Sequence, residues 1–194
     1  MNQNAISAFE YVSILISIIL GLGITQILSS IAESIHSSTK VKPYLPHTIW
    51  VVVILFMHIQ EWFIIYELKE YPVWKLPTFL FILLYPIALF IITKLLFPLH
   101  ISDDKIDLRE YFLTNFSKIF YLFCLCIFLS ISFNILILKA ILWQQLLLLI
   151  PFALFFFIDS KKIKTNWVHQ ILSIFILLLI IITTIAEQNE WYIK

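Results

Sequence analysis

Six long apolar stretches follow one another along the 194 residues and leave only short polar connections between them. A helix that crosses a lipid bilayer needs about 20 largely apolar residues. Since 61% of the chain is hydrophobic, a soluble domain of this size could not bury its apolar side chains. The sequence therefore predicts an all-α fold, a polytopic transmembrane helix bundle in one integral membrane domain, with spans at 8–31, 48–68, 76–96, 117–138, 141–158 and 167–186.

The fifth stretch is the least regular of the six. It is short, carries Gln144 and Gln145 near its start and Pro151 in its middle, and follows the fourth stretch almost directly. A five-span or re-entrant arrangement is therefore an open alternative. We expect Pro151, like Pro86 in the third stretch, to kink its helix without ending it, because neighbouring helices can satisfy the freed carbonyl groups.

The distribution of basic residues predicts the orientation of the bundle. With six spans, the first, third and fifth loops share one side of the membrane, and cytoplasmic loops carry the excess of lysine and arginine. Nine basic residues flank these loops and four flank the others, which favours a bacterial inner membrane protein with loops 1, 3 and 5 in the cytoplasm and both termini outside. The nine are Lys40, Lys42, Lys94, Lys105, Arg109, Lys118, Lys161, Lys162 and Lys164, and the four are Lys69, Lys75, Lys139 and Lys194. No basic residue precedes Lys40, so we expect the first stretch to stay in the mature protein.

Charge, glycine and cysteine content exclude several classes of function. The formal net charge is only +1, which provides no basic field for nucleic acid. Gly21 and Gly23 are the only glycines and both lie in the first stretch, so there is no glycine-rich loop for nucleotide phosphates. Cys124 and Cys126 point to different faces of one helix and are expected to be inert buried thiols. We expect no cofactor.

Several potential metal ligands lie near the predicted cytoplasmic interface: His36, His47, His100, His169, Glu33 and Asp159. Together they could form a metal site. We interpret the histidines instead as solvated side chains of the loops, and we predict no metal ion.

His58 and Glu61 are the most informative polar residues. His58 is the midpoint of the stretch 48–68, and Glu61 follows it by three residues, so both lie on one helical face. A charge at that depth costs about 2.5 to 3.5 kcal/mol on insertion scales, and intramembrane ionisable residues usually have a function. We interpret the pair as part of a polar intramembrane site that Glu10 and Asn134 could also reach. The alternative is a hydrogen-bonded pair that only fixes the orientation of the helix.

The first stretch carries small or hydroxylated residues at strict four-residue spacing: Ser13, Ser17, Gly21, Thr25 and Ser29. Such a stripe allows another helix backbone to approach closely, so we interpret it as a helix-packing surface. A polar stripe lining a pore is the alternative. Gln26 is too large for the packing role, and we expect it to bond to a neighbouring helix as part of the polar site.

Parts of the chain resemble a known group of proteins. The segment from Phe9-Glu10-Tyr11-Val12-Ser13 through Ser17-Ile18-Ile19-Leu20-Gly21-Leu22-Gly23-Ile24-Thr25, with Leu96-Phe97-Pro98 and Asp107-Leu108-Arg109-Glu110-Tyr111-Phe112, resembles a family of small multi-pass bacterial inner-membrane proteins without an assigned activity. The resemblance lies mainly in the first half. It implies a similar polytopic layout and adds interest to Glu10, Gly21, Gly23 and Arg109.

These observations lead to three functional hypotheses. The first is a pore or sensor subunit, homo-oligomeric or with a partner protein, that conducts or senses an ion, a proton or a small solute through its polar interior. The second is an assembly or effector subunit of a stress or defence system, in which the polar residues are structural. The third is an intramembrane enzyme with His58 and Glu61 as acid and base, which ranks last because no nucleophile accompanies them.

Overall fold

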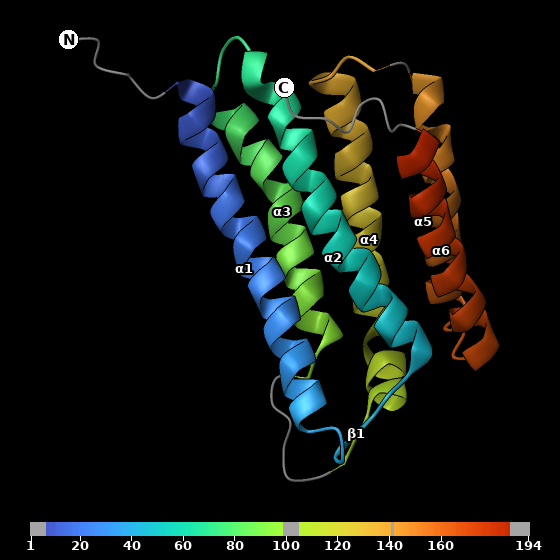
Figure 1. The fold of residues 1–194 in the computed structure, drawn as a ribbon. Helices are drawn as coiled ribbons and strands as arrows, with labels where there is room; N and C mark the ends of the chain where they lie inside the picture. The colour runs from blue at the N-terminus through green and yellow to red at the C-terminus, as the bar shows by residue number, and fades with distance from the viewer. Residues whose placement is uncertain (1–6, 99–104, 141, 187–194) are drawn as a thin grey trace.

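A computed structural model describes residues 7–98, 105–140 and 142–186, apart from the side chains of 142–144. The described chain is an all-α bundle with two short 3₁₀ segments and one pair of short strands (Figure 1). In chain order the elements are α1 (Ala8–His36), β1 (Val41–Lys42), α2 (Leu45–Tyr66), η1 (Glu67–Glu70), α3 (Leu76–Leu96), β2 (Ile106–Asp107), α4 (Leu108–Leu136), η2 (Leu142–Leu148), α5 (Leu149–Ser160) and α6 (Asn166–Ala186).

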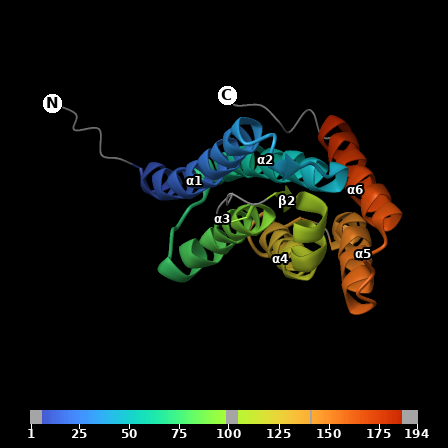
Figure 2. The ribbon, with the colours of Figure 1, turned by 90° about the horizontal axis from the view of Figure 1, so that it is seen from below.

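The helices form two layers, and each helix runs antiparallel to the one before it in the chain (Figure 1). Seen from below, α1, α2 and α6 make one layer, and α3, α4 and α5 make the other (Figure 2). The interface between the layers holds the aromatic core, in which the fully buried Trp50 of α2 contacts Phe123 of α4 and Phe155 of α5, with ring centroids 4.9 and 5.7 Å away. This aromatic core thus ties α2 to α4 and α5.

Five of the described helical segments are long and apolar enough to cross a membrane: α1, α2 with η1, α3, α4 and α6. This confirms the all-α bundle. The fifth predicted span is different, because α5 has 12 residues and rises only about 18 Å at 1.5 Å per residue, whereas a bilayer core is about 30 Å thick. The seven residues of η2 precede α5 and lengthen the segment.

The two prolines inside predicted spans behave differently. Pro86 lies inside α3, which continues to Leu96 as expected. Pro151 lies in the first turn of α5, where the backbone N–H groups have no partner within the helix. The expectation that Pro151 kinks its helix in the middle is therefore wrong.

Helix α4 begins nine residues earlier than the apolar stretch 117–138 predicts. The Asp107 carboxylate caps this helix and accepts a hydrogen bond from the Arg109 backbone N–H at 2.9 Å. The apolar stretch misses the first turns because they carry charged residues such as Arg109 and Glu110.

The loops after α1 and after α3 meet at one end of the bundle. β1 and β2 form a parallel pair, with Val41 opposite Ile106 and Lys42 opposite Asp107. The Lys42 ammonium contacts the Asp107 carboxylate at 2.8 Å. Two connections that are distant in sequence are therefore fastened together.

Candidate polar site in the helix bundle

The carboxyl group of Glu61 lies at a small cavity between three helices. Glu61 comes from α2 and is only 8% exposed. Tyr85 of α3 and Ser130 and Asn134 of α4 are the other polar residues that line the cavity, and the rest of its wall is apolar. Its volume is about 40 Å³, and a water molecule needs about 10 to 15 Å³ by the same measure. The cavity therefore has room for water but not for a large ligand.

Within the part of the chain that the structure describes, the Glu61 carboxyl group accepts no hydrogen bond and forms no ion pair. A charged carboxylate in such a place has a large desolvation penalty. Two changes relieve it: the carboxyl group binds a proton, or water enters the cavity and donates hydrogen bonds. Either change makes this group able to exchange a proton.

Asn134 lies beside Glu61 as the sequence led us to expect, and it connects the cavity to η2. Its side-chain amide donates a hydrogen bond to the Gln145 side-chain oxygen at 2.7 Å. Gln145 is itself 9% exposed. The polar wall of the cavity thus continues toward η2, at the end of the bundle where α4 finishes. We did not predict Tyr85 or Ser130, which have no sequence signal beyond polarity within an apolar stretch.

His58 points away from the Glu61 cavity. Its Nδ1 atom lies 2.8 Å from the carbonyl oxygen of Ile54 in the preceding turn, so Nδ1 carries the proton and the neutral ring presents Nε2 as an acceptor. Nε2 is buried without a partner among the described residues and faces Gly23 of α1. The alternative of a hydrogen-bonded pair of His58 and Glu61 therefore does not hold in this structure, because His58 faces α1, whereas Glu61 faces α3 and α4.

Gly23 of α1 packs directly against this imidazole. A Cβ atom added at Gly23 would lie 2.6 Å from His58 Cδ2 and closer still to Nε2. Only a glycine therefore accommodates the ring without a shift. At Gly21, in contrast, an added Cβ atom would meet no heavy atom within 4 Å.

Gln26 bonds to a neighbouring helix as expected, but outside the Glu61 cavity. Its amide donates to the Ser30 hydroxyl at 2.9 Å, and its carbonyl oxygen accepts a hydrogen bond from the Lys94 ammonium of α3. These contacts join α1 to α3. Glu10 also lies outside the cavity, since it is exposed and forms a capping box with Ser7 at the start of α1. The expectation that Glu10 reaches the cavity is therefore wrong.

The stripe of small residues on α1 does not pack against the described bundle. Gly21, Thr25 and Ser29 are exposed and Ser13 and Ser17 are half-buried, whereas the buried face consists of Val12, Ile16, Leu20, Gly23, Ile27 and Ser30. Larger side chains fill the contact with α2 and α3. Among the described residues, the stripe therefore does not form the buried face of α1, and the space at its centre, Gly21, is open.

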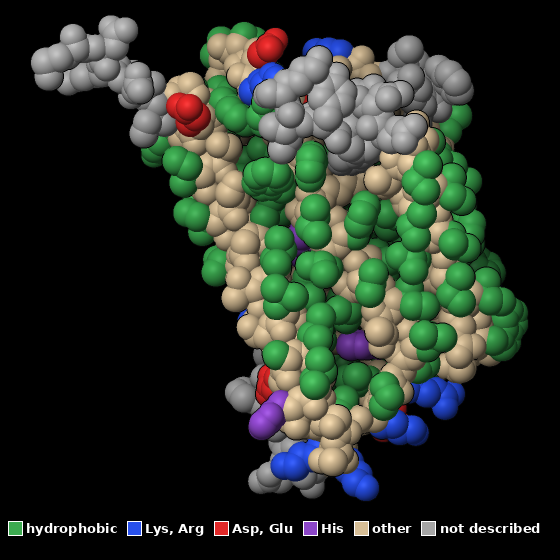
Figure 3. Space-filling model, in the orientation of Figure 1, with side chains coloured by type: hydrophobic (Ala, Val, Ile, Leu, Met, Phe, Trp, Pro, Cys, Tyr) green, Lys and Arg blue, Asp and Glu red, His purple; other side chains and the backbone are tan. Residues whose placement is uncertain are grey.

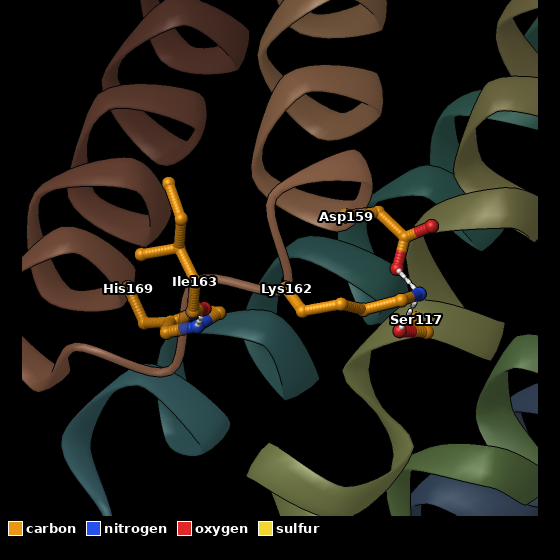
Figure 4. Close-up of polar contacts among 5 residues, drawn as sticks. All are labelled: Ser117, Asp159, Lys162, Ile163 and His169. Carbon is orange, nitrogen blue, oxygen red and sulfur yellow. Dashed lines mark hydrogen bonds and ion pairs between the residues drawn. The ribbon is translucent and has the colours of Figure 1, made fainter.

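Polar contacts also occur at the opposite end of the bundle, where α4, α5 and α6 meet (Figure 4). Lys162, just after α5, contacts the buried Asp159 carboxylate at 2.7 Å and donates to the Ser117 hydroxyl at 3.0 Å. His169 of α6 is fully buried and its Nε2 atom lies 2.8 Å from the Ile163 carbonyl oxygen. These contacts hold the connection between α5 and α6.

The interpretation of the histidines as solvated loop side chains is wrong at two positions. His169 is buried, and His47 is 3% exposed with its Nε2 atom 2.7 Å from the Leu96 carbonyl oxygen. His36 is exposed, and His100 lies outside the described residues. Among the described residues, no group of three or more His, Cys, Asp or Glu side chains comes together as a metal site.

Comparison of the chain with protein-family models, with curated proteins and with solved structures finds no match. The resemblance of its first half to a family of bacterial membrane proteins therefore stays a prediction. The polar side chains around Glu61 therefore provide the basis for assigning a function.

Proposed function

We propose that this chain is a multi-pass protein of the bacterial inner membrane and that its Glu61 site conducts or senses protons or a small ion, as a pore or sensor subunit. The observation that carries the proposal is the buried carboxyl group at a water-sized cavity, without a hydrogen-bond partner among the described residues. Intramembrane carboxyl groups that face a cavity commonly mark ion and proton pathways. In this proposal η2 and α5 together form the fifth of six passes.

The size of the cavity favours the smallest of the ligands considered. Pockets for small organic molecules have volumes of about 300 to 1,000 Å³. The Glu61 cavity has about 40 Å³. Water, protons and small ions fit this space, whereas an organic solute does not.

Further polar groups follow the axis of the bundle on both sides of Glu61. Toward the end formed by η2 lie Asn134 and Gln145, which bond to each other. In the other direction His58 lies one turn from Glu61 and faces Gly23, and Gln26 with Ser30 follows further along α1. Because α1 and α2 run antiparallel (Figure 1), these groups lie at successive heights of the bundle, with His58 facing α1 and Glu61 facing α3 and α4.

Flux measurements test this proposal directly. The purified chain in proteoliposomes should dissipate an imposed proton gradient. Glu61→Leu should abolish the flux because, among the described residues, Glu61 is the only carboxyl-bearing residue that lines the cavity. His58→Phe should also reduce the flux if the path continues along α2. Glu70→Gln is the matched control, because Glu70 is an exposed glutamate at the end of η1. A proton flux equal to that of the native chain in both the Glu61→Leu and the His58→Phe variant would contradict the proposal.

A second candidate function is an assembly or effector subunit. It is favoured by the outward-facing stripe on α1, which leaves room at Gly21 for the backbone of another helix, as in a homo-oligomer or a complex with a partner protein. Gly21→Leu should then dissociate the assembly, as measured by light scattering in detergent. Leu22→Ala on the neighbouring exposed face is the control. An unchanged assembly in Gly21→Leu would exclude the stripe as the interface.

A further inference from the structure

An apolar groove opens between α5 and α6. α5 packs on α4 and α6 packs on α2, so the two helices lie at the ends of different layers and contact each other little (Figure 2). The groove has a volume of about 600 Å³ and is lined mainly by Leu154, Phe157, Trp167, Val168, Ile171 and Phe175. Its wall is almost entirely apolar, and Phe157 and Ile171 are 55% and 59% exposed.

One end of this groove is positively charged. The connection between α5 and α6 contains Lys161, Lys162 and Lys164, and the adjoining Thr165 lines the groove. Lys162 is engaged by Asp159 and Ser117, as Figure 4 shows. Lys161 and Lys164 are exposed and contact no carboxylate among the described residues. Two exposed lysines without a carboxylate partner among the described residues therefore belong to the connection whose Ile163 and Thr165 line the groove.

We propose that an anionic phospholipid binds at this site, with an acyl chain in the α5–α6 groove and its phosphate at Lys161 and Lys164. The apolar wall matches the hydrocarbon, and the lysines match the charge of the headgroup. Trp167, 62% exposed at the same end, presents an amphipathic ring of the kind that lies at headgroup level. A purely apolar occupant such as another helix would provide no negative charge to interact with the two lysines.

The inference rests on the membrane insertion proposed above, but it does not depend on the role of Glu61. Asp159 contributes to it indirectly. Asp159 neutralises Lys162, and Ser117 holds the Lys162 side chain toward α4. Lys161 and Lys164 therefore remain as the positive charges near the groove.

Native mass spectrometry of the full chain in detergent, with either phosphatidylglycerol or phosphatidylcholine added back, tests the site. We expect the chain to retain phosphatidylglycerol preferentially. One lysine near a membrane surface contributes roughly a fivefold gain in binding, so Lys161→Gln and Lys164→Gln should each weaken retention about fivefold, and together about 25-fold. Lys75→Gln, which removes an exposed lysine at the opposite end, should leave retention unchanged.

A second variant tests the groove separately from the charge. Val168→Phe adds volume inside the groove without altering a lysine, so it should lower retention of both lipids while circular dichroism shows an unchanged helix content. Equal retention of the two lipids by the native chain, or preference that survives the double lysine substitution, would overturn the site.

Vesicle flotation separates failure of this site from failure of the proposed function. A chain that floats with vesicles but shows no preference for phosphatidylglycerol lacks the lipid site and leaves the Glu61 proposal intact. A chain that does not float with vesicles overturns membrane insertion itself, and both proposals with it.

Discussion

His58 and Glu61 lie three residues apart on α2, yet their surroundings give them different capacities. The imidazole is held by the Ile54 carbonyl oxygen and is enclosed by α1 at Gly23. The carboxyl group lies at a cavity and has no partner among the described residues. The hydrogen bond and the close packing restrict the imidazole, whereas the carboxyl group lies beside space for water. Glu61 is therefore the more informative target for functional tests.

The contact between Gly23 and His58 yields a stability prediction. Gly23→Ala should lower the free energy of unfolding by about 1 to 3 kcal/mol, because overpacking a filled contact has roughly this penalty. Gly21→Ala is the matched control and should be neutral or slightly stabilising, since its Cβ atom meets open space and alanine favours the helix. Thermal unfolding in detergent measures both.

A double substitution shows whether the Gly23→Ala effect comes from the imidazole. His58→Ala removes the ring that the new methyl group would meet, so adding Gly23→Ala to His58→Ala should cause little further loss. Strictly additive losses would mean that another neighbour of Gly23 is responsible.

At the scale of elements, the length of the apolar stretches predicts where the helices lie in the chain, but it does not predict which face of each helix is buried. Runs of about 20 apolar residues are required by bilayer thickness, so α3 and α6 begin and end close to their predicted positions. In lipid, however, the inward and outward faces of a helix are both apolar, so periodicity does not reveal which face is buried. For this reason the stripe at Gly21 was expected to pack, while the actual close approach is at Gly23.

The same limit explains the rest of the site. The Glu61 cavity could be anticipated because a carboxyl group amid apolar residues stands out, and so could the participation of Asn134. The direction of His58 depends on the rotation of α2 against α1, which no sequence pattern records. The start of α4 at Leu108 depends on the Asp107 cap, and its charged first turn hides it from any search for apolar residues.

The ion pair between Lys42 of β1 and Asp107 of β2 predicts that the stability of the chain depends on pH. The hydrogen bond from Lys42 lowers the pKa of Asp107 below its usual value. A carboxyl group with a lowered pKa contributes stability above the pKa of the unfolded chain, about 3.9, and loses it as the pH falls through the lower folded value. Asp107→Asn keeps a capping oxygen but no charge, so the native chain should exceed it in stability at pH 7 and not at pH 2.

The expected size of this difference is below about 1 kcal/mol, because the pair is exposed and screened by water and salt. Asp107→Ala also removes the cap and should lose about 1 kcal/mol more, at every pH. Thermal unfolding across this pH range resolves the two effects. A constant gap between the native chain and Asp107→Asn from neutral to acid pH would show that the ion pair contributes nothing.

At the scale of the whole molecule, the two ends of the bundle differ in charge. Lysine and arginine gather at the end that carries β1, β2 and the connection between α5 and α6 (Figure 3). The sides between the ends are largely apolar, with exposed residues such as Leu22, Phe128 and Ile182. This distribution is compatible with a bundle that crosses a bilayer. The excess of lysine and arginine in cytoplasmic loops predicts that its more basic end lies in the cytoplasm.

Cysteine labelling in intact cells tests that orientation. In a background with Cys124→Ala and Cys126→Ala, Lys75→Cys should react with a membrane-impermeant maleimide, because it precedes α3 at the less basic end. Lys164→Cys, at the basic end, should react only after the cells are permeabilised. The opposite pattern would invert the orientation while leaving the spanning bundle in place. Labelling of both positions from outside intact cells would instead contradict a bundle that separates its two ends by a membrane.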